Sequence, residues 1–262
     1  IDGVEHYEIN RNARFEAPLE LVTAPKLLAE TGQPFRFQFY FGERNETTRL
    51  ELLGGTLPAG IEYKGDRFEG VPTETGQFHL KVSVQHDGQT RQGLFSIRLH
   101  GHNLAGDAAE VLTNESPTTD DIEIIRDGQR RGATYYNRAP DAEPRVNFYG
   151  YRWDEPRVIS TLVFNPGLPE EFGGWFTSLR VQYLSEYGMW LNAPLLSLLP
   201  PMNFDNTQWL KGAYIDHSLR IEPVTTTAIR IIGNAGGVEM DERNGGGRSF
   251  YSAISELAVY AD

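Results

Sequence analysis

Residues 78–85 read FHLKVSVQ, an alternation of apolar and polar side chains that predicts a β-strand with one buried face. The same period of two occurs at residues 35–41, FRFQFYF, where the phenylalanines fall on one face of the expected strand. A third strand is expected at residues 94–99, LFSIRL. These segments predict that the first part of the chain is built from β-strands.

Proline and glycine separate the expected strands. LPAG at residues 57–60 and GVPTETG at residues 70–76 place proline where a fixed φ suits a turn and glycine where a positive φ is wanted. Short strands with such turns between them favour a β-sandwich.

The turn segments also support a family resemblance. TGQPF (residues 31–35), LPAGI (57–61) and GVPTETG (70–76) resemble the immunoglobulin-like domains that occur in strings on bacterial surface proteins. The resemblance implies a spacer domain, which we assign to residues 23–102. Residues 1–22 before it are expected to form a leading connector or an edge strand.

A second domain is expected at residues 103–262, because HGHNLAGD at residues 100–107 breaks the alternation with small and polar residues. No segment sustains a period of 3.6, which favours a jelly-roll sandwich over an α/β enzyme fold. Further strands are expected at residues 122–125, 146–149, 158–164, 179–184, 218–222, 229–232 and 254–260.

Three segments of this second domain carry another resemblance. IIRDGQ (residues 124–129), LRVQY (179–183) and ISELAVY (254–260) resemble the discoidin or coagulation-factor type C domains, which share the galactose-binding-like jelly roll with family-32 carbohydrate-binding modules. FGGWF (172–176) resembles a subgroup of these modules attached to bacterial polysaccharide-degrading proteins. The predicted fold class is therefore all-β: an immunoglobulin-like sandwich followed by a galactose-binding-like jelly roll.

The second resemblance implies one structural calcium ion, held by an Asp-Gly turn and a glutamate near the end of the chain. A hard cation takes carboxylate and carbonyl oxygens, and a glycine turn lets several of these converge. A bulge expected in the last strand would aim its glutamate at the turn. The expected ligands are Asp127 and Glu256 with oxygen atoms of Ile124, Gln129 and Ser255. The family commonly has Thr or Ser after the turn, and this chain has two arginines and a glycine there. The alternative is that the aspartate only stabilises its turn and the glutamate pairs with an arginine.

Three loops are expected to supply a sugar site, at residues 134–144, 165–176 and 234–250. Aromatic rings pack against the apolar face of a pyranose, and short polar groups bind its hydroxyls. The candidate residues are Tyr135, Tyr136, Trp175, Asn244, Arg248 and Phe250. Each aromatic residue has core packing as its alternative, and Trp190 is assigned to the core.

Composition excludes several functions. The formal net charge of −12 repels nucleic acid, and no apolar run is long enough for membrane insertion. The chain lacks cysteine, which removes disulfides and thiolate chemistry and favours an exported protein, at the cell surface, in the periplasm or outside the cell. No nucleophile elbow, zinc-protease helix or phosphate-binding loop occurs, so no enzyme activity is expected.

We therefore expect a non-catalytic carbohydrate-binding accessory region of a secreted or surface polysaccharide-active protein. Its expected partners are a glycan and other domains of the parent chain, which would contain any catalytic domain. The sequence begins at Ile1 without a leader, so we expect a portion of a larger protein. One alternative is a structural or adhesive module that binds protein. Another is an enzyme fragment, which would need carboxylates opposed across a cleft.

Overall fold

The computed structural model shows two compact units, Ile1–His102 and Asn103–Asp262. It describes residues 22–38, 49–65, 67–86, 89–114, 121–129, 132–137, 146–202, 204, 214–240 and 247–261. Almost all of the expected leading connector therefore lies outside the described residues. Within the described residues, no helix is long and apolar enough to cross a membrane.

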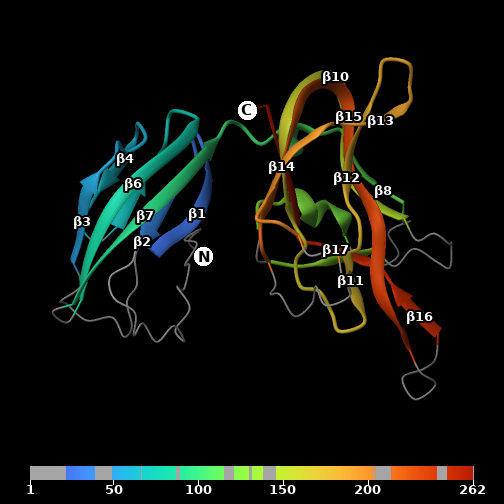
Figure 1. The fold of residues 1–262 in the computed structure, drawn as a ribbon. Coiled ribbons are helices and arrows are strands. Elements are labelled where there is room, and N and C mark those ends of the chain that lie inside the picture. The colour runs from blue at the N-terminus through green and yellow to red at the C-terminus, as the bar shows by residue number, and fades with distance from the viewer. Residues whose placement is uncertain are drawn as a thin grey trace. The chain divides into compact units, whose positions relative to one another are not determined.

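The N-terminal unit contains two sheets (Figure 1). In one, the strand order is β1 (Val22–Glu30), β7 (Gln89–His100), β6 (Gly76–His86) and β3 (Arg49–Gly54). In the other, it is β2 (Phe35–Gln38), β5 (Arg67–Gly70) and β4 (Ile61–Tyr63). Strand β1 pairs parallel to β7, and the other pairs are antiparallel.

Both sheets contribute to one hydrophobic core, so the N-terminal unit is a β-sandwich. The buried core residues are Phe37, Ile61 and Phe68 from one sheet and Leu80, Val82, Ile97 and Leu99 from the other. In β6, Leu80 and Val82 are buried while His79 and Lys81 are exposed, which agrees with the predicted alternation, but Ser83 is buried as well, so the alternation does not extend past Val82. The immunoglobulin-like family assignment stays a prediction.

The C-terminal unit is organised by one long antiparallel ladder, β10 (Val146–Asn165) with β15 (His217–Met240). Register shifts after Arg152 and Ile159 interrupt it, so that a first part at Val146–Arg152 and a second part at Thr161–Phe164 are separated by a short paired stretch at Arg157–Ile159. The first part is flanked by β8 (Glu110–Thr113) and by β12 (Arg180–Leu184) followed by β13 (Trp190–Asn192). The second part is flanked by β18 (Glu256–Tyr260) and β14 (Leu195–Leu199).

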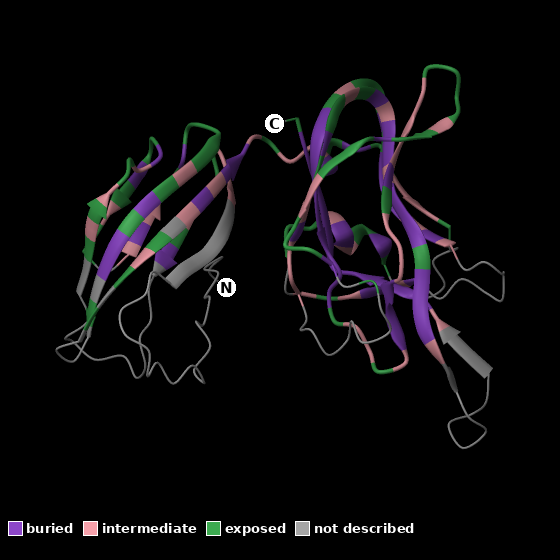
Figure 2. Cartoon of the chain, viewed as in Figure 1, coloured by how far each residue is buried: buried purple, intermediate pink, exposed green. Residues whose placement is uncertain are grey.

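Both parts of the ladder face the same core. Tyr149 and Ile231 come from the first part, and Phe164 and Leu219 from the second, and all belong to one cluster of buried side chains. Figure 2 shows the buried positions along the strands and exposed positions at the turn between β12 and β13. The described elements are strands and two 3₁₀ helices, which confirms the predicted all-β class.

Four short strands lie beside the end of β15. They are β9 (Tyr135–Asn137), β17 (Ser252–Ile254), β11 (Gly173–Phe176) and β16 (Gly247–Phe250). Strand β11 pairs with both β15 and β17, β17 pairs with β9, and β16 pairs with β15. The pairing therefore brings together parts of all three loops that were expected to supply a sugar site.

The strand predicted at residues 122–125 is wrong, because this segment is the 3₁₀ helix η2 (Ile122–Arg126). The side chain of Asp121 caps the helix by accepting a hydrogen bond of 2.9 Å from the Glu123 amide. Residues three apart share a face of a 3₁₀ helix, so Ile122 and Ile125 are buried together.

The last predicted strand, residues 254–260, is divided in two. β17 pairs with β9, whereas β18 pairs with β10, and at the change of partner the Ser255 amide donates to the Asn165 carbonyl over 2.8 Å. This change replaces the expected bulge. The Glu256 side chain, directly after it, is 1% exposed.

Candidate functional site

The predicted calcium ligands lie in two segments that meet in space. The amide of Gly128 donates a hydrogen bond of 3.1 Å to Oε2 of Glu256, across 128 positions of sequence. The Ser255 hydroxyl lies 3.4 Å from the Gln129 carbonyl oxygen, which accepts its hydrogen bond. Oδ1 of Asp127 accepts from the Gln129 amide over 2.7 Å. The turn at residues 127–129 and the start of β18 thus form one local unit.

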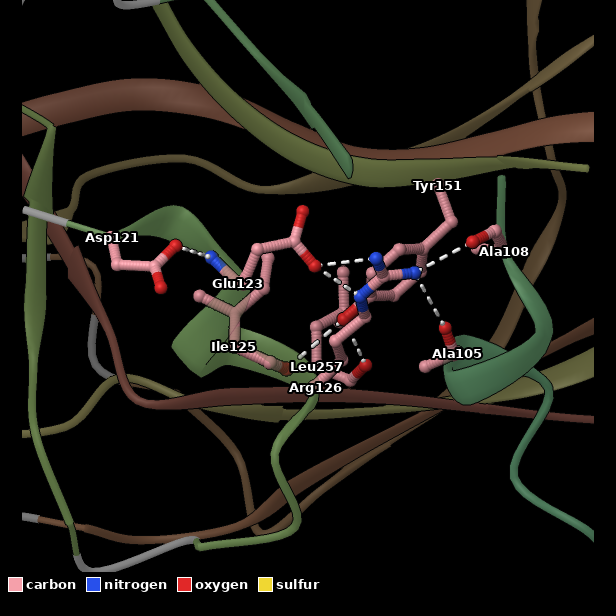
Figure 3. Close-up of polar contacts among 8 residues, drawn as sticks. All are labelled: Ala105, Ala108, Asp121, Glu123, Ile125, Arg126, Tyr151 and Leu257. Carbon is pink, nitrogen blue, oxygen red and sulfur yellow. Dashed lines mark hydrogen bonds and ion pairs between the residues drawn. The ribbon is translucent and has the colours of Figure 1, made fainter. Parts of the chain in front are cut away.

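A buried tyrosine holds these two segments together (Figure 3). The Tyr151 hydroxyl lies 3.0 Å from the carbonyl oxygen of Ile125 and 2.8 Å from that of Leu257, and it can donate its proton to either. Burial, and secondarily the charge of Glu256, raises the pKa of Tyr151 well above its ordinary value. The phenol therefore stays protonated and remains a donor.

Arg126 attaches the same segment to the 3₁₀ helix η1 (Leu104–Asp107) (Figure 3). Its Nε donates to Oε2 of Glu123 over 2.6 Å, and Nη2 is paired with the same carboxylate. Nη1 donates to the carbonyl oxygens of Ala108 at 2.6 Å and Ala105 at 3.4 Å. Each guanidinium nitrogen has an acceptor from the protein, so this arginine has a structural role.

The donor set at this unit is of the type that calcium takes, carboxylate and carbonyl oxygen. Asp127 is exposed and Glu256 is buried, so a bound ion would have one solvent-facing and one interior carboxylate. In the described part of the chain, no three His, Asp or Glu side chains gather as a metal site. Carbonyl oxygens of Ile124 and Gln129 would have to complete the shell, with the chemistry of a structural and not a catalytic ion.

A second group of residues lies where the three loops meet. The Tyr136 hydroxyl donates to the Leu168 carbonyl over 2.9 Å, and the Tyr136 ring packs edge-to-face on Tyr251 with centroids 5.9 Å apart. The Tyr251 hydroxyl donates in turn to Oε2 of Glu170. We call Tyr136, Leu168, Glu170 and Tyr251 the rim cluster. All except Tyr251 are at least partly exposed.

The structure does not support a sugar-stacking role for Tyr135 or Trp175. They are 2% and 1% exposed, so neither ring has a face open to solvent. A Cβ atom on Gly236 would lie 2.0 Å from Nε1 of Trp175, which shows how closely the backbone covers the indole. The burial pattern of β11 is continuous, which the sequence FGGWF does not indicate.

The remaining candidates have different outcomes. Phe250 is partly exposed at the end of β16, directly before Tyr251 in the sequence. The backbone of Arg248 belongs to β16, opposite Glu239 of β15, and its side chain lies outside what is described. Asn244 lies outside the described residues. Sequence reasoning missed Leu168, Glu170 and Tyr251 as site residues, although each lies in or beside a loop that it selected.

The core assignment of Trp190 is wrong. The residue is only partly buried, and the guanidinium carbon of Arg230 lies 4.0 Å from its ring centroid. Strand β13, which contains Trp190, is the terminal strand in the strand order of its sheet and pairs with β12.

Neither a protein-family model nor a curated protein matches the chain. Several solved structures resemble it, and they are carbohydrate-binding modules. A family-32 module from Clostridium perfringens NanJ, in complex with galactose, has 16% identity and a TM-score of 0.40 over 60% of this chain and 95% of that chain. A module from a family-31 glycoside hydrolase of Clostridium perfringens has 11% identity and a TM-score of 0.43 over 60% and 93%.

A chitosan-binding module from a Paenibacillus chitosanase/glucanase has 12% identity and a TM-score of 0.40, over 61% of this chain and 98% of that chain. Similarity at this level establishes neither a family nor a ligand.

Proposed function

We propose that the C-terminal unit is a non-catalytic glycan-binding module of a secreted or surface polysaccharide-active protein, and that the rim cluster binds the sugar. The observation that supports this is the meeting of the three loops at a partly exposed tyrosine ring. Tyr136 is anchored through its hydroxyl to Leu168 and through a T-shaped ring contact to Tyr251, which reduces the conformational entropy that binding has to remove.

The rim cluster combines the two kinds of surface that a pyranose needs. Leu168 is 48% exposed and, with the Tyr136 ring, offers apolar area for the C–H face of a sugar. The Glu170 carboxylate, which accepts a hydrogen bond from the Tyr251 hydroxyl, is the kind of acceptor that binds sugar hydroxyls. Aromatic, apolar and hydrogen-bond acceptor groups are sufficient for binding a sugar, so the proposed role needs no catalytic group.

The experiment is a binding screen of the full chain on a broad array of neutral glycans, followed by affinity electrophoresis with the best ligand. Tyr136→Ala is expected to lower the affinity at least about tenfold, the effect of losing one well-packed contact of about 1.4 kcal/mol. Tyr187→Ala is the matched control, since Tyr187 is 77% exposed and lies outside the three loops.

Circular dichroism checks that Tyr136→Ala folds. If it does not, Leu168→Asp serves as the test, because this exposed position tolerates a polar side chain more readily. A folded wild-type chain that binds no glycan, or rim variants that bind as well as wild type, would overturn the proposal. The first result would favour the structural or adhesive alternative.

We also propose that one calcium ion stabilises the C-terminal unit at the turn of residues 127–129. Its support is the convergence of Asp127, Glu256 and the carbonyl oxygens of the turn, which belong to segments far apart in the sequence. Such an ion would brace the two segments that Tyr151 already joins.

A further inference from the structure

A row of paired residues, most of them polar, crosses the outer face of the sheet that the first part of the ladder forms. Gly150 in β10 pairs with Arg230 in β15, Arg230 pairs with Gln182 in β12, and Gln182 pairs with Asn192 in β13. Cross-strand partners point to the same side of a sheet. The opposite side is occupied by core residues such as Tyr149 and Ile231, so this row faces away from the core.

Arg230 lies between two aromatic rings. Its guanidinium carbon is 4.6 Å from the ring centroid of Phe148 and 4.0 Å from that of Trp190. Both distances are within the range of cation–π attraction, which holds the guanidinium plane in place. The guanidinium is thus pre-organised, and Arg230 is only partly buried.

One amide orients the guanidinium and uses only one of its edges. Nε and Nη2 of Arg230 both donate to Oε1 of Gln182, at 3.0 and 2.8 Å. Nε2 of Gln182 donates to Oδ1 of Asn192 over 3.0 Å, which determines which amide atom faces the arginine. A guanidinium has five N–H donors in a planar fork. The edge formed by Nη1 and Nη2 therefore retains donors beyond those that Gln182 accepts.

The charge of Arg230 has no counter-ion from the described residues, none of which forms an ion pair with it. The charge that acts on the guanidinium is that of Arg180, which has the same sign. Burial, followed by this repulsion, lowers the pKa of Arg230 from its ordinary value. Two cations on one face without an ion-pair partner in the described part of the chain are unexpected at a net charge of −12.

We propose that this face is a second binding site, separate from the rim cluster, for a uronic acid unit of an acidic polysaccharide. The Nη1–Nη2 edge of Arg230 binds the sugar carboxylate as a two-pronged fork. Trp190 supplies apolar surface beside it, and the amide of Asn192 is placed to bind a sugar hydroxyl. Arg180 adds attraction at longer range.

The composition of this site favours an acidic sugar over an acidic peptide or a nucleic acid. A nucleic acid binds mainly by placing several phosphates against several cations, and this face offers Arg230 and Arg180. A single uronate carboxylate needs one fork. The ring of the uronate sugar can also pack on the Trp190 ring and bind the Asn192 amide through a hydroxyl, whereas a phosphate backbone has no comparable ring.

The test measures binding of the full chain, by isothermal titration calorimetry, to tetrasaccharides of galacturonic, glucuronic and mannuronic acid. Each acid is compared with its methyl ester, which keeps the ring and hydroxyls and loses the charge. We expect at least one free acid to bind and its ester to bind at least about tenfold more weakly, as expected for loss of a charge-assisted fork.

Arg230→Met keeps an unbranched side chain between the two rings and removes the fork. It is expected to weaken binding of the acid at least about tenfold. The matched control is Arg152→Met on the same sheet face, because Arg152 is exposed and has Glu110 as its partner, 3.6 Å away. Arg230→Lys, which keeps the charge without the fork, should fall between wild type and Arg230→Met.

The proposal is overturned if none of the free acids binds, if the esters bind as well as the acids, or if a glutamate-rich peptide binds more tightly than any uronate. It is also overturned if folded Arg230→Met binds as wild type. Should that variant not fold, the comparison of acid and ester on the wild-type chain decides. Failure of the rim proposal is a separate result, because it concerns neutral glycans and Tyr136.

Discussion

Arg126 and Arg230 belong to the same unit of the protein and have opposite surroundings. Arg126 donates to one carboxylate and two backbone carbonyls, so its guanidinium nitrogens are satisfied within the protein. Arg230 donates to a single amide oxygen and lies between two rings, with no carboxylate partner among the described residues. The difference teaches that residue type does not distinguish a structural arginine from a binding arginine. The hydrogen-bond acceptors that the protein places around each guanidinium do distinguish them.

The comparison predicts that Arg126→Met has the largest effect on stability. The variant leaves Glu123 and two carbonyls without their donor, so we expect a loss of about 2–3 kcal/mol in the free energy of unfolding. Urea denaturation of the C-terminal unit measures it. Arg152→Met, at an exposed ion pair, is the control and should change stability by less than about 1 kcal/mol. Equal effects of the two substitutions would contradict the structural role of Arg126.

Removal of calcium should have the next largest effect, and it acts on the segment that Arg126 anchors. An ion that binds only the folded state at 100 times its Kd stabilises it by about 2.7 kcal/mol. Excess chelator should therefore lower the Tm of the C-terminal unit, and added calcium should restore it. In Asp127→Asn the chelator should have a smaller effect. A transition that chelator leaves unchanged in wild type would remove the calcium proposal.

Arg230→Met should change stability little, in contrast to Arg126→Met. The cation–π contacts contribute about 0.5–1 kcal/mol at exposed sites, and removal of the repulsion from Arg180 offsets part of their loss. We expect a change within about 1 kcal/mol by urea denaturation. A loss as large as that of Arg126→Met would mean that Arg230 is structural, and it would end the contrast between the two sites.

The smallest effect on stability is predicted for the protonation of His217. Like Arg230, this side chain has a nitrogen atom without a hydrogen-bond partner among the described residues. Its Nδ1 donates to the Pro200 carbonyl over 2.9 Å, while the buried Nε2 has no hydrogen-bond partner among the described residues. Burial lowers the pKa of His217 from 6.5, although the Pro200 carbonyl and Asp216 oppose the shift. The unfolded chain therefore binds the proton more readily, so stability falls as the pH drops below 6.5.

The measurement is the free energy of unfolding at about pH 7.5 and about pH 5.5, on either side of the histidine transition. His217→Gln can keep a donor toward Pro200 and cannot titrate, so the difference between the two pH values should be smaller in the variant. An unchanged difference would show that other groups cause the pH dependence.

Periodicity and turn chemistry were sufficient to predict the fold class. The alternation at residues 78–85 depends on local geometry, since successive strand residues point to opposite faces wherever the strand lies. The segment 122–125 was assigned wrongly because a short apolar run fits a strand or a 3₁₀ turn equally well, and the Asp121 cap decided between them.

The candidate sites were predicted only in part. The sequence pointed to Glu256 and to the turn at residues 127–129, and in the structure Gly128 and Glu256 share a hydrogen bond. Aromatic loop residues could not be divided into buried and exposed ones, because the burial of Trp175 depends on Gly236 of a distant strand. Local sequence contains no information on that contact.

From its sequence alone, this protein is an all-β chain with glycine-rich loops, a cysteine-free composition and an acidic net charge. Only the tertiary structure decided that Phe148, Gln182, Trp190 and Arg230 meet on one face. They come from four strands, and strand order and register determine which residues become neighbours. Register is set by how the whole core packs, and each segment taken separately fits more than one pairing.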